Sequence, residues 1–222
     1  MTVKAAIFDL DGTLLNTLGD LRASLEAALL ENGQGRSFTD EEFKFMVGNG
    51  LTKLIERAMG PGVLEEGEFL EKVRRSFKKF YAKNLKNQTA PYPGIPELVT
   101  KLKADGFRLG VWTNKDEDHA KDLIEAFFPG LFIKVVGAAP PRPLKPSPQA
   151  GLELAEVLGA WPKNLWYLGD SETDAQSAQA CGFIAVGVAW GFRSIKELRA
   201  AGVKVILEKP EDFYPVLEGF HG

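Results

Sequence analysis

Helix-like and strand-like segments alternate through residues 92–218, and this alternation restricts the possible folds more than any other feature of the chain. The strand-like segments are short and apolar, at residues 107–112, 134–136, 165–168, 184–188 and 203–206. Helix-like segments separate them, near residues 118–127, 148–158, 172–181 and 194–201. Strands that alternate with helices form a parallel sheet with helices on both faces. We therefore expect an α/β fold with a doubly wound parallel sheet, which the apolar run at residues 5–8 joins as a further strand.

Residues 17–90 differ from this pattern, because they show helical periodicity and no convincing strand. Apolar residues recur at helical spacing in three stretches: Leu18, Leu21, Leu25 and Leu29; Leu51, Leu54, Ile55, Ala58 and Met59; and Phe69, Val73, Phe77, Phe80 and Tyr81. A further helix is expected near Thr39, which forms a capping-box pattern with Glu42. We expect an all-helical bundle over residues 17–90, inserted into a Rossmann-like core formed by residues 1–16 and 91–222.

Composition and charge exclude several classes of function. The net charge of −3 and the scattered Lys and Arg residues give no basic patch for nucleic acid. No apolar stretch is as long as a signal-peptide core or a membrane span, so we expect a cytoplasmic protein without a membrane partner. The expected oligomeric state is a monomer or homodimer. Cys181 is the only cysteine, and its small and apolar neighbours favour a buried structural thiol over a nucleophile. His119 and His221 are the only histidines, which are too few ligands for a histidine-rich zinc site. Carboxylates are therefore the expected reactive groups.

The candidate chemistry begins where the first expected strand runs into Asp9-Leu10-Asp11-Gly12-Thr13. Residues two apart in an extended chain point the same way, so Asp9 and Asp11 are expected to present two negative groups to one small volume. Facing carboxylates raise one pKa strongly or recruit a metal ion, and either outcome is useful for chemistry. The alternative is a hydrophilic turn, because Asp and Gly are also favoured in turns for conformational reasons.

Further polar motifs lie near the ends of later expected strands, as Asp9 and Asp11 do after the first one. They are Thr113-Asn114-Lys115, Lys145-Pro146-Ser147-Pro148 and Gly169-Asp170-Ser171-Glu172-Thr173-Asp174. Ligands of a parallel sheet collect outside the carboxyl ends of its strands, so these side chains are expected to converge with Asp9 and Asp11. Each motif taken alone also fits a plainer interpretation as a helix cap or a solvated loop.

Counting charges predicts what completes such a site. Lys145 alone cannot balance the carboxylates that would gather around it, which are Asp9, Asp11, Asp170 and Asp174. A hard divalent cation can, and a set of oxygen ligands favours Mg²⁺. With metal and lysine in place, the pocket attracts a phosphoryl group, to which the Thr113 hydroxyl and nearby backbone N–H groups donate hydrogen bonds. The implied reaction is phosphoryl transfer.

Together these motifs resemble the haloacid dehalogenase superfamily, and within it the phosphoglycolate phosphatase-like branch. The resemblance is carried by Asp9-Leu10-Asp11-Gly12-Thr13, Thr113-Asn114-Lys115, Lys145-Pro146 and the run from Gly169 to Asp174. It spans nearly the whole chain and includes the insertion point of the helical segment, which it identifies as a cap domain. The resemblance implies a Mg²⁺-dependent phosphomonoester hydrolase that forms an aspartyl-phosphate and acts on a small phosphorylated metabolite.

The resemblance also implies a role for each matched residue. Asp9 would be the nucleophile that takes the phosphoryl group. Asp11 would protonate the leaving alkoxide and afterwards activate water. Thr113, the backbone N–H of Asn114, and Lys145 would hold the phosphoryl oxygens.

The metal ligands follow from the same resemblance. Mg²⁺ would be bound by Asp9, by the backbone carbonyl of Asp11 and by Asp170. Asp174 would orient these ligands or Lys145 from behind them, or contact the metal itself.

Substrate recognition is expected in the helical cap. Gly48, Asn49 and Gly50 look like the family's cap loop, and Lys53 or Arg57 would be available for an anionic tail. The alternative is that this Gly-x-Gly merely separates two helices.

Several segments bear on the identity of the substrate. Similarity over residues 47–59, together with residues 113–115 and Trp190-Gly191-Phe192, favours 2-phosphoglycolate, although Trp190 and Phe192 fit equally well as core or rim aromatics. The chain reads Leu15-Asn16-Thr17 where the family commonly has an acidic residue and then a small hydroxyl residue. This lost charge bears on cap closure and substrate preference rather than on the catalytic core.

Three rival functions stay open. A phosphomutase would return the phosphoryl group to a sugar, and a pyrophosphatase would differ only in the leaving group. A signalling or scaffold module would accept phosphate on Asp9 and hold it without turnover. Intact Asp11, Lys145 and Asp170 argue against the last of these.

Overall fold

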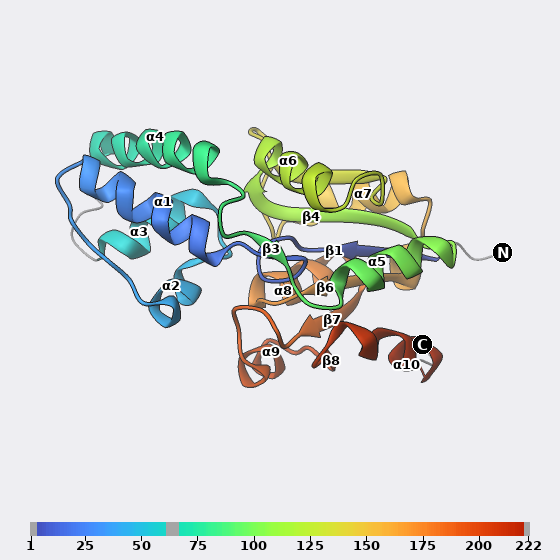
Figure 1. Ribbon diagram of the computed structural model, residues 1–222. Helices are drawn as coiled ribbons and strands as arrows, with labels where there is room; N and C mark the ends of the chain where they lie inside the picture. The colour runs from blue at the N-terminus through green and yellow to red at the C-terminus, as the bar shows by residue number, and fades with distance from the viewer. Residues whose placement is uncertain (1–3, 61–66, 220–222) are drawn as a thin grey trace.

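The computed structural model describes residues 4–60 and 67–219. At its centre lie the strands β1 (Ala5–Phe8), β4 (Arg108–Asp116), β5 (Lys134–Ala138), β6 (Leu165–Gly169), β7 (Ile184–Val188) and β8 (Val205–Leu207). They form a six-stranded sheet in the order β5-β4-β1-β6-β7-β8, and all neighbours pair in parallel (Figure 1). The chain moves from β1 outward to β4 and β5 and then crosses to β6, which puts β1 at the point where such sheets bind ligands. The predicted doubly wound α/β fold is confirmed.

Helices cover both faces of this sheet. They are α5 (Ile95–Ala104), α6 (Glu117–Phe127) and α10 (Phe213–Gly219) on one face, and α7 (Gln149–Leu158) and α8 (Glu172–Cys181) on the other. The short helix α9 (Ile195–Ala200) packs against α8. β1 shows why both faces are needed, because Ala6 and Phe8 belong to one core cluster and Ala5 and Ile7 to the other. A strand buried on both sides reads as a continuous apolar run rather than an alternating one.

Four helices form a separate lobe beside the sheet (Figure 1). They are α1 (Leu18–Glu31), α2 (Asp40–Met46), α3 (Leu51–Met59) and α4 (Gly67–Asn84). The predicted capping box starts α2, since the Glu42 N–H donates to Thr39 Oγ1 (3.3 Å) and the Thr39 N–H donates to the Glu42 carboxylate (2.8 Å). The chain enters and leaves the lobe through an antiparallel ribbon of β2 (Leu15–Asn16) and β3 (Ala90–Pro91).

Several elements differ from the sequence-based expectation. β4 continues through the polar motif at residues 113–115, because these residues are buried between neighbouring segments. β8 begins at Val205 rather than at Val203, whose N–H instead donates to the Leu198 carbonyl in the turn after α9 (3.1 Å). The β2–β3 ribbon and α10 were not expected, since strands of two residues show no periodicity.

Two further expectations concern single residues and membrane spans. Cys181 is buried, as predicted, and burial raises the pKa of its thiol to about 11. His221 lies outside the described residues. Among the helices that the structure describes, none is both long enough and apolar enough to span a bilayer.

Candidate active site

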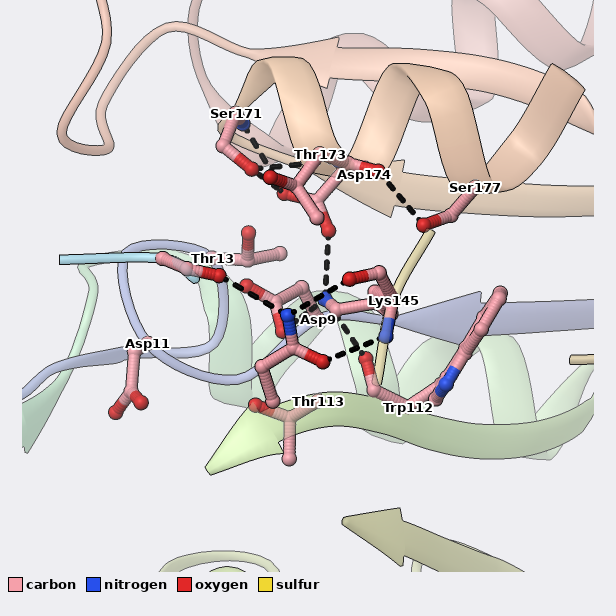
Figure 2. A network of polar contacts seen from close by, with 12 residues as sticks. Asp9, Asp11, Thr13, Trp112, Thr113, Lys145, Ser171, Thr173, Asp174 and Ser177 are labelled. Carbon is pink, nitrogen blue, oxygen red and sulfur yellow. Dashed lines mark hydrogen bonds and ion pairs between the residues drawn. The ribbon is translucent and has the colours of Figure 1, made fainter. Parts of the chain in front are cut away.

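β1 places Asp9 at the carboxyl end of the central strand. The Asp9 N–H donates to the Leu168 carbonyl of β6 (2.9 Å), which fixes its backbone to the sheet. Its side chain is buried, and Oδ1 lies 2.8 Å from Lys145 Nζ (Figure 2). The two residues that the motifs were expected to bring together are therefore in direct contact across 136 positions of sequence.

Lys145 is the centre of a buried polar network (Figure 2). It lies in the loop ahead of α7, and its side chain is 2% exposed. Besides Asp9, Nζ contacts Asp174 Oδ1 (2.7 Å), the Tyr167 hydroxyl (3.0 Å) and the Trp112 carbonyl (3.2 Å). Burial alone would lower the pKa of this ammonium, but the carboxylates of Asp174 and Asp9 raise it above its ordinary value. Lys145 is therefore a fixed positive charge.

Asp170 and Asp174 follow β6, on either side of a helix cap. Asp170 Oδ2 accepts a hydrogen bond from the Phe192 N–H (2.7 Å). Ser171 caps α8, since the Asp174 N–H donates to Ser171 Oγ (3.3 Å) and the Ser171 N–H donates to Asp174 Oδ2 (3.1 Å). The plainer interpretation of a helix cap is thus correct for Ser171. The same cap also holds Asp174 in place beside Lys145.

The carboxylates of Asp9, Asp170 and Asp174 lie close together, and the single charge of Lys145 cannot neutralise all three. One oxygen of each lies within 4.8 Å of the others. Burial raises the pKa of Asp9 to about 7, although the neighbouring Lys145 acts in the opposite direction. Burial likewise raises the pKa of Asp170 well above its ordinary value, and the negative charges of Asp174 and Asp9 add to the effect. Oxygen donors crowded in this way fit a hard divalent cation such as Mg²⁺.

Asp11 lines the same cavity as Asp9, but its carboxylate is turned elsewhere. Its carboxylate points away from Asp9 (Figure 2) and accepts hydrogen bonds from Thr17 Oγ1 (2.6 Å) and Lys115 Nζ (2.9 and 3.2 Å). Asp9 and Asp11 therefore line one cavity as expected, but the expectation that their side chains point the same way is wrong. The alternation of an extended strand does not continue past Phe8, where β1 ends, and the two partners then determine the direction of Asp11.

The end of β4 supplies Thr113 and Asn114, which are both buried. Thr113, which Figure 2 labels, lines the same cavity as Asp9. Asn114 acts as a bridge, because its Oδ1 accepts from the Lys145 N–H (2.8 Å) and its Nδ2 donates to the Gly48 carbonyl (3.2 Å). The side chain of Asn114 thus fixes the Lys145 backbone and reaches the helical lobe, while binding of phosphate by its backbone N–H stays a prediction.

A cavity of about 280 Å³ lies between the sheet and the helical lobe. The sheet side contributes Asp9, Asp11, Thr113, Asn114, Lys115, Lys145 and Asp170, and the lobe contributes Gly48, Asn49, Gly50, Phe77 and Tyr81. The predicted cap loop therefore reaches the site. It is also attached to the sheet side, since Asn49 Nδ2 donates to Thr173 Oγ1 (2.8 Å).

Lys53 and Arg57 are not among the residues that line this cavity. Lys53 Nζ pairs with Glu56 (2.6 Å), and its side chain is 59% exposed. Arg57 donates to Asn49 Oδ1 (2.6 Å) and to the Met46 carbonyl (2.9 Å). The expectation that either residue is available for an anionic tail is wrong for this structure, because Arg57 holds the cap loop in shape instead.

Trp190 and Phe192 contact the segments that carry the acidic residues. Trp190 Nε1 donates to the Thr13 carbonyl (3.0 Å), and the Phe192 ring packs in the core while its N–H binds Asp170. Sequence reasoning missed Tyr167, whose hydroxyl donates to Asp174 Oδ1 (2.8 Å). A tyrosine in an otherwise apolar strand that leads into a motif was a usable signal for it.

Comparison with known proteins extends these observations to the whole chain. The sequence profile of the haloacid dehalogenase-like hydrolases matches residues 6–188. The phosphoglycolate phosphatase of Aquifex aeolicus is 30% identical over 217 residues, which cover 97% of each chain. The phosphoglycolate phosphatase of Mannheimia succiniciproducens is 34% identical over 83% of this chain and 85% of its own length.

A solved structure shows the same arrangement of sheet and lobe. It is a protein from Lactobacillus delbrueckii subsp. bulgaricus, provisionally described as a phosphoglycolate phosphatase, and it superposes with a TM-score of 0.92 at 32% identity. The superposition covers 99% of this chain and 100% of that one. The similarity thus includes the helical lobe as well as the sheet.

Proposed function

Because this chain belongs to the haloacid dehalogenase-like hydrolase family and is a phosphatase, we propose that it hydrolyses 2-phosphoglycolate through an aspartyl-phosphate on Asp9. The observation that carries the proposal is the contact of Asp9 with Lys145 at a cavity that Thr113 and Asp170 also line. The names of the relatives support the choice of substrate. A small phosphorylated metabolite also suits the size of the cavity.

In the first step, an Asp9 carboxylate oxygen attacks phosphorus and the bond from phosphorus to the ester oxygen breaks. Asp11 gives its proton to the departing alkoxide, so the products are the aspartyl-phosphate and an alcohol. Before this transfer Asp11 has to turn away from Lys115 and Thr17, whose side chains its carboxylate contacts in this structure, and take up one proton from solvent.

In the second step, Asp11 is a carboxylate and removes a proton from a water molecule that attacks the same phosphorus atom. The bond from Asp9 to phosphorus breaks, inorganic phosphate leaves, and Asp11 is protonated again. Water supplies both the oxygen and the proton that the products carry, so the residues return to their starting states.

Phosphate binding is assigned to groups around Asp9. Lys145 and Thr113 would hold the phosphoryl oxygens together with the Asn114 N–H. Asp9, Asp170 and the backbone carbonyl of Asp11 would hold Mg²⁺, which when bound supplies further positive charge for the phosphoryl oxygens. Asp174 would orient Lys145, which it already contacts at 2.7 Å.

The helical lobe would act as a cap over residues 1–16 and 91–222, which we propose as the catalytic core. Residues 17–90 would exclude water from the cavity and recognise the leaving group. Gly48, Asn49 and Gly50 would take part in recognition, since they line the cavity from the lobe side.

The test is phosphate release from a panel of small phosphate esters and pyrophosphate, with Mg²⁺ and with excess EDTA. We expect the highest kcat/KM for 2-phosphoglycolate, equal release of phosphate and glycolate, and no activity in EDTA. Asp9→Asn should lower kcat by about 10⁴-fold without changing the fold. The matched control is Asp118→Asn, an exposed aspartate on α6, which should behave like the wild type.

Each rival function has its own signature in this assay. Unequal release of phosphate and alcohol would indicate a phosphomutase, and preference for pyrophosphate a pyrophosphatase. A long-lived phosphorylated protein with negligible turnover would indicate a phospho-acceptor module. Normal activity of Asp9→Asn would rule out the nucleophile, and full activity in EDTA would rule out the metal.

A further inference from the structure

Lys115 connects the sheet to the helical lobe at the wall of the cavity. It lies near the end of β4 and is 8% exposed. Its Nζ contacts both carboxylate oxygens of Asp11, at 2.9 and 3.2 Å, and lies 4.6 Å from the centre of the Tyr81 ring on α4. Burial alone would lower the pKa of the Lys115 ammonium, but Asp11 and Tyr81 raise it above its ordinary value. The cavity thus contains a permanent positive charge that already carries one carboxylate.

Tyr81 lines the same cavity, and within the described ranges 4–60 and 67–219 its hydroxyl has no hydrogen-bond acceptor, since the neighbouring Lys115 ammonium can only donate. The residue is 1% exposed. Its ring stacks on Phe77 (5.3 Å between centres) and meets the edge of His119 (5.4 Å), so the hydroxyl cannot turn to solvent. Burial raises the pKa of Tyr81 to about 12, so the hydroxyl keeps its proton and can donate a hydrogen bond. A buried donor of this kind requires an acceptor.

Lys145 is already assigned to the phosphoryl group, and the other cationic side chains that line the cavity, Lys115 apart, pair with carboxylates that the proposed reaction does not use. These pairs are Lys78 with Asp116 (3.2 Å), Arg74 with Glu71 (3.2 Å), Arg193 with Glu172 (3.3 Å) and Arg142 with Glu117. Lys115 differs from them, because its partner Asp11 is the group that must move to the ester oxygen.

We propose that Lys115 and Tyr81 bind the carboxylate of the substrate's leaving group, and that this carboxylate replaces Asp11 on Lys115. The inference rests on the proposed function, which gives Asp11 the role of acid. The exchange itself makes and breaks no covalent bond, since one carboxylate takes the place of another on the same ammonium, and the released Asp11 carboxylate then takes up one proton from solvent. Asp11 is then free to turn toward the ester oxygen. An ester without a carboxylate leaves Asp11 paired with Lys115, so Lys115 is both a specificity and a positioning residue.

The spacing of the two ends of the site suits a short substrate. Thr113 and Lys115 are two residues apart on β4 and both line the cavity. The pairing of β4 with β5 is irregular between Trp112 and Asp116, so the backbones of Thr113 and Lys115 lie at most about 7 Å apart, the span of two residues in a regular strand. One strand end can therefore hold a phosphoryl group at Thr113 and a carboxylate at Lys115. A leaving group of two carbons fits between these positions.

The experiment compares 2-phosphoglycolate with ethyl phosphate, which has the same chain length and no carboxylate. The measured quantity is the ratio of the two kcat/KM values, with Mg²⁺ present, in the wild type, Tyr81→Phe and Lys115→Met. We expect each variant to lower this ratio by about 10- to 100-fold, because each loses a hydrogen bond to a charged group. The matched control is Lys79→Met on α4, the helix that carries Tyr81. Lys79 is exposed and pairs with Glu31, so this variant should not change the ratio.

The outcomes separate this inference from the proposed function. If the wild type releases phosphate from neither ester, the proposed function is overturned and the inference with it. If the wild type hydrolyses 2-phosphoglycolate but both variants keep the wild-type ratio, or lose activity on both esters equally, the inference is overturned and the proposed function stands. Tyr81→Phe removes a single oxygen atom, so it decides the question even if Lys115→Met fails to fold, which thermal melting would show.

Discussion

The backbone of Gly12 packs directly against the carboxylate of Asp170, and a Cβ atom at position 12 would lie 2.2 Å from Asp170 Oδ2. Gly12 also has a φ of +85°, a backbone conformation that residues other than glycine rarely adopt. We expect Gly12→Ala to lower the free energy of unfolding by about 1–3 kcal/mol, from backbone strain and displacement of Asp170. Because Asp170 is a proposed metal ligand, the variant should also lose the rise in Tm that Mg²⁺ gives the wild type, which a thermal melt with and without Mg²⁺ measures.

Gly202→Ala is the matched control for this prediction. Gly202 has a nearly identical φ of +88°, but a Cβ atom there would meet nothing within 4 Å. It should therefore cost only the backbone strain, about 1 kcal/mol, and keep the Mg²⁺-dependent rise in Tm. Equal effects of the two substitutions on stability and on the response to Mg²⁺ would show that the contact with Asp170 is unimportant.

The parts of the fold that were predictable from sequence are those with a local signal. The strand at residues 184–188 and the helix at 172–181 have the predicted bounds, because apolar periodicity and the Ser171 cap mark them within a few residues. The β2–β3 ribbon left no such signal. Its pairing of Leu15 with Pro91 is a tertiary contact between two-residue strands.

The candidate site divides along the same line. Asp9, Lys145 and Asp170 were predictable because Asp9 and Asp170 directly follow strands and Lys145 lies in the loop between β5 and α7, so the topology of the parallel sheet brings them together. The direction of Asp11 was not, since it depends on contacts with Thr17 and with Lys115, which lies 104 positions away. Side-chain direction beyond the end of a strand is set by such partners and not by periodicity.

Arg193 joins the loop after β7 to the helical lobe. Its guanidinium donates to the carbonyl oxygens of Lys44 (2.6 Å) and Val47 (3.1 Å), and the residue is buried. Arg193→Ala leaves these carbonyls without their donor, so we expect the free energy of unfolding to fall by about 2–3 kcal/mol in urea titrations. We also expect a higher KM for 2-phosphoglycolate, because Val47 precedes the loop that lines the cavity.

Arg75→Ala is the matched control on the lobe itself, where Arg75 is exposed. It should change the free energy of unfolding by less than about 0.5 kcal/mol and leave KM unchanged. If Arg193→Ala behaves in the same way, the contacts of Arg193 with the lobe contribute nothing measurable in solution.

Glu117 opens α6 and connects three segments at the edge of the cavity. Its carboxylate pairs with Lys121 (2.7 Å) and Arg142 and accepts the Gly137 N–H (3.2 Å). Burial alone would raise the pKa of Glu117, but Lys121, Arg142 and the Gly137 N–H together lower it from 4.5 to about 2. Folding therefore favours the ionised form of Glu117.

This shift predicts how stability depends on pH. Above pH 4.5 the carboxylate is ionised in the folded and the unfolded chain, and its contacts stabilise the fold fully. Between pH 4.5 and about 2 the unfolded chain binds the proton first, so the contribution is lost as the pH falls. We expect Glu117→Gln to be less stable than the wild type by a constant amount above pH 5, and the difference to shrink below pH 4.5, in urea unfolding at a series of pH values. Glu125→Gln, an exposed position on the same helix, should follow the wild type at every pH. A difference between wild type and Glu117→Gln that is as large at pH 3 as at pH 7 would show that the ion pairs of Glu117 do not cause it.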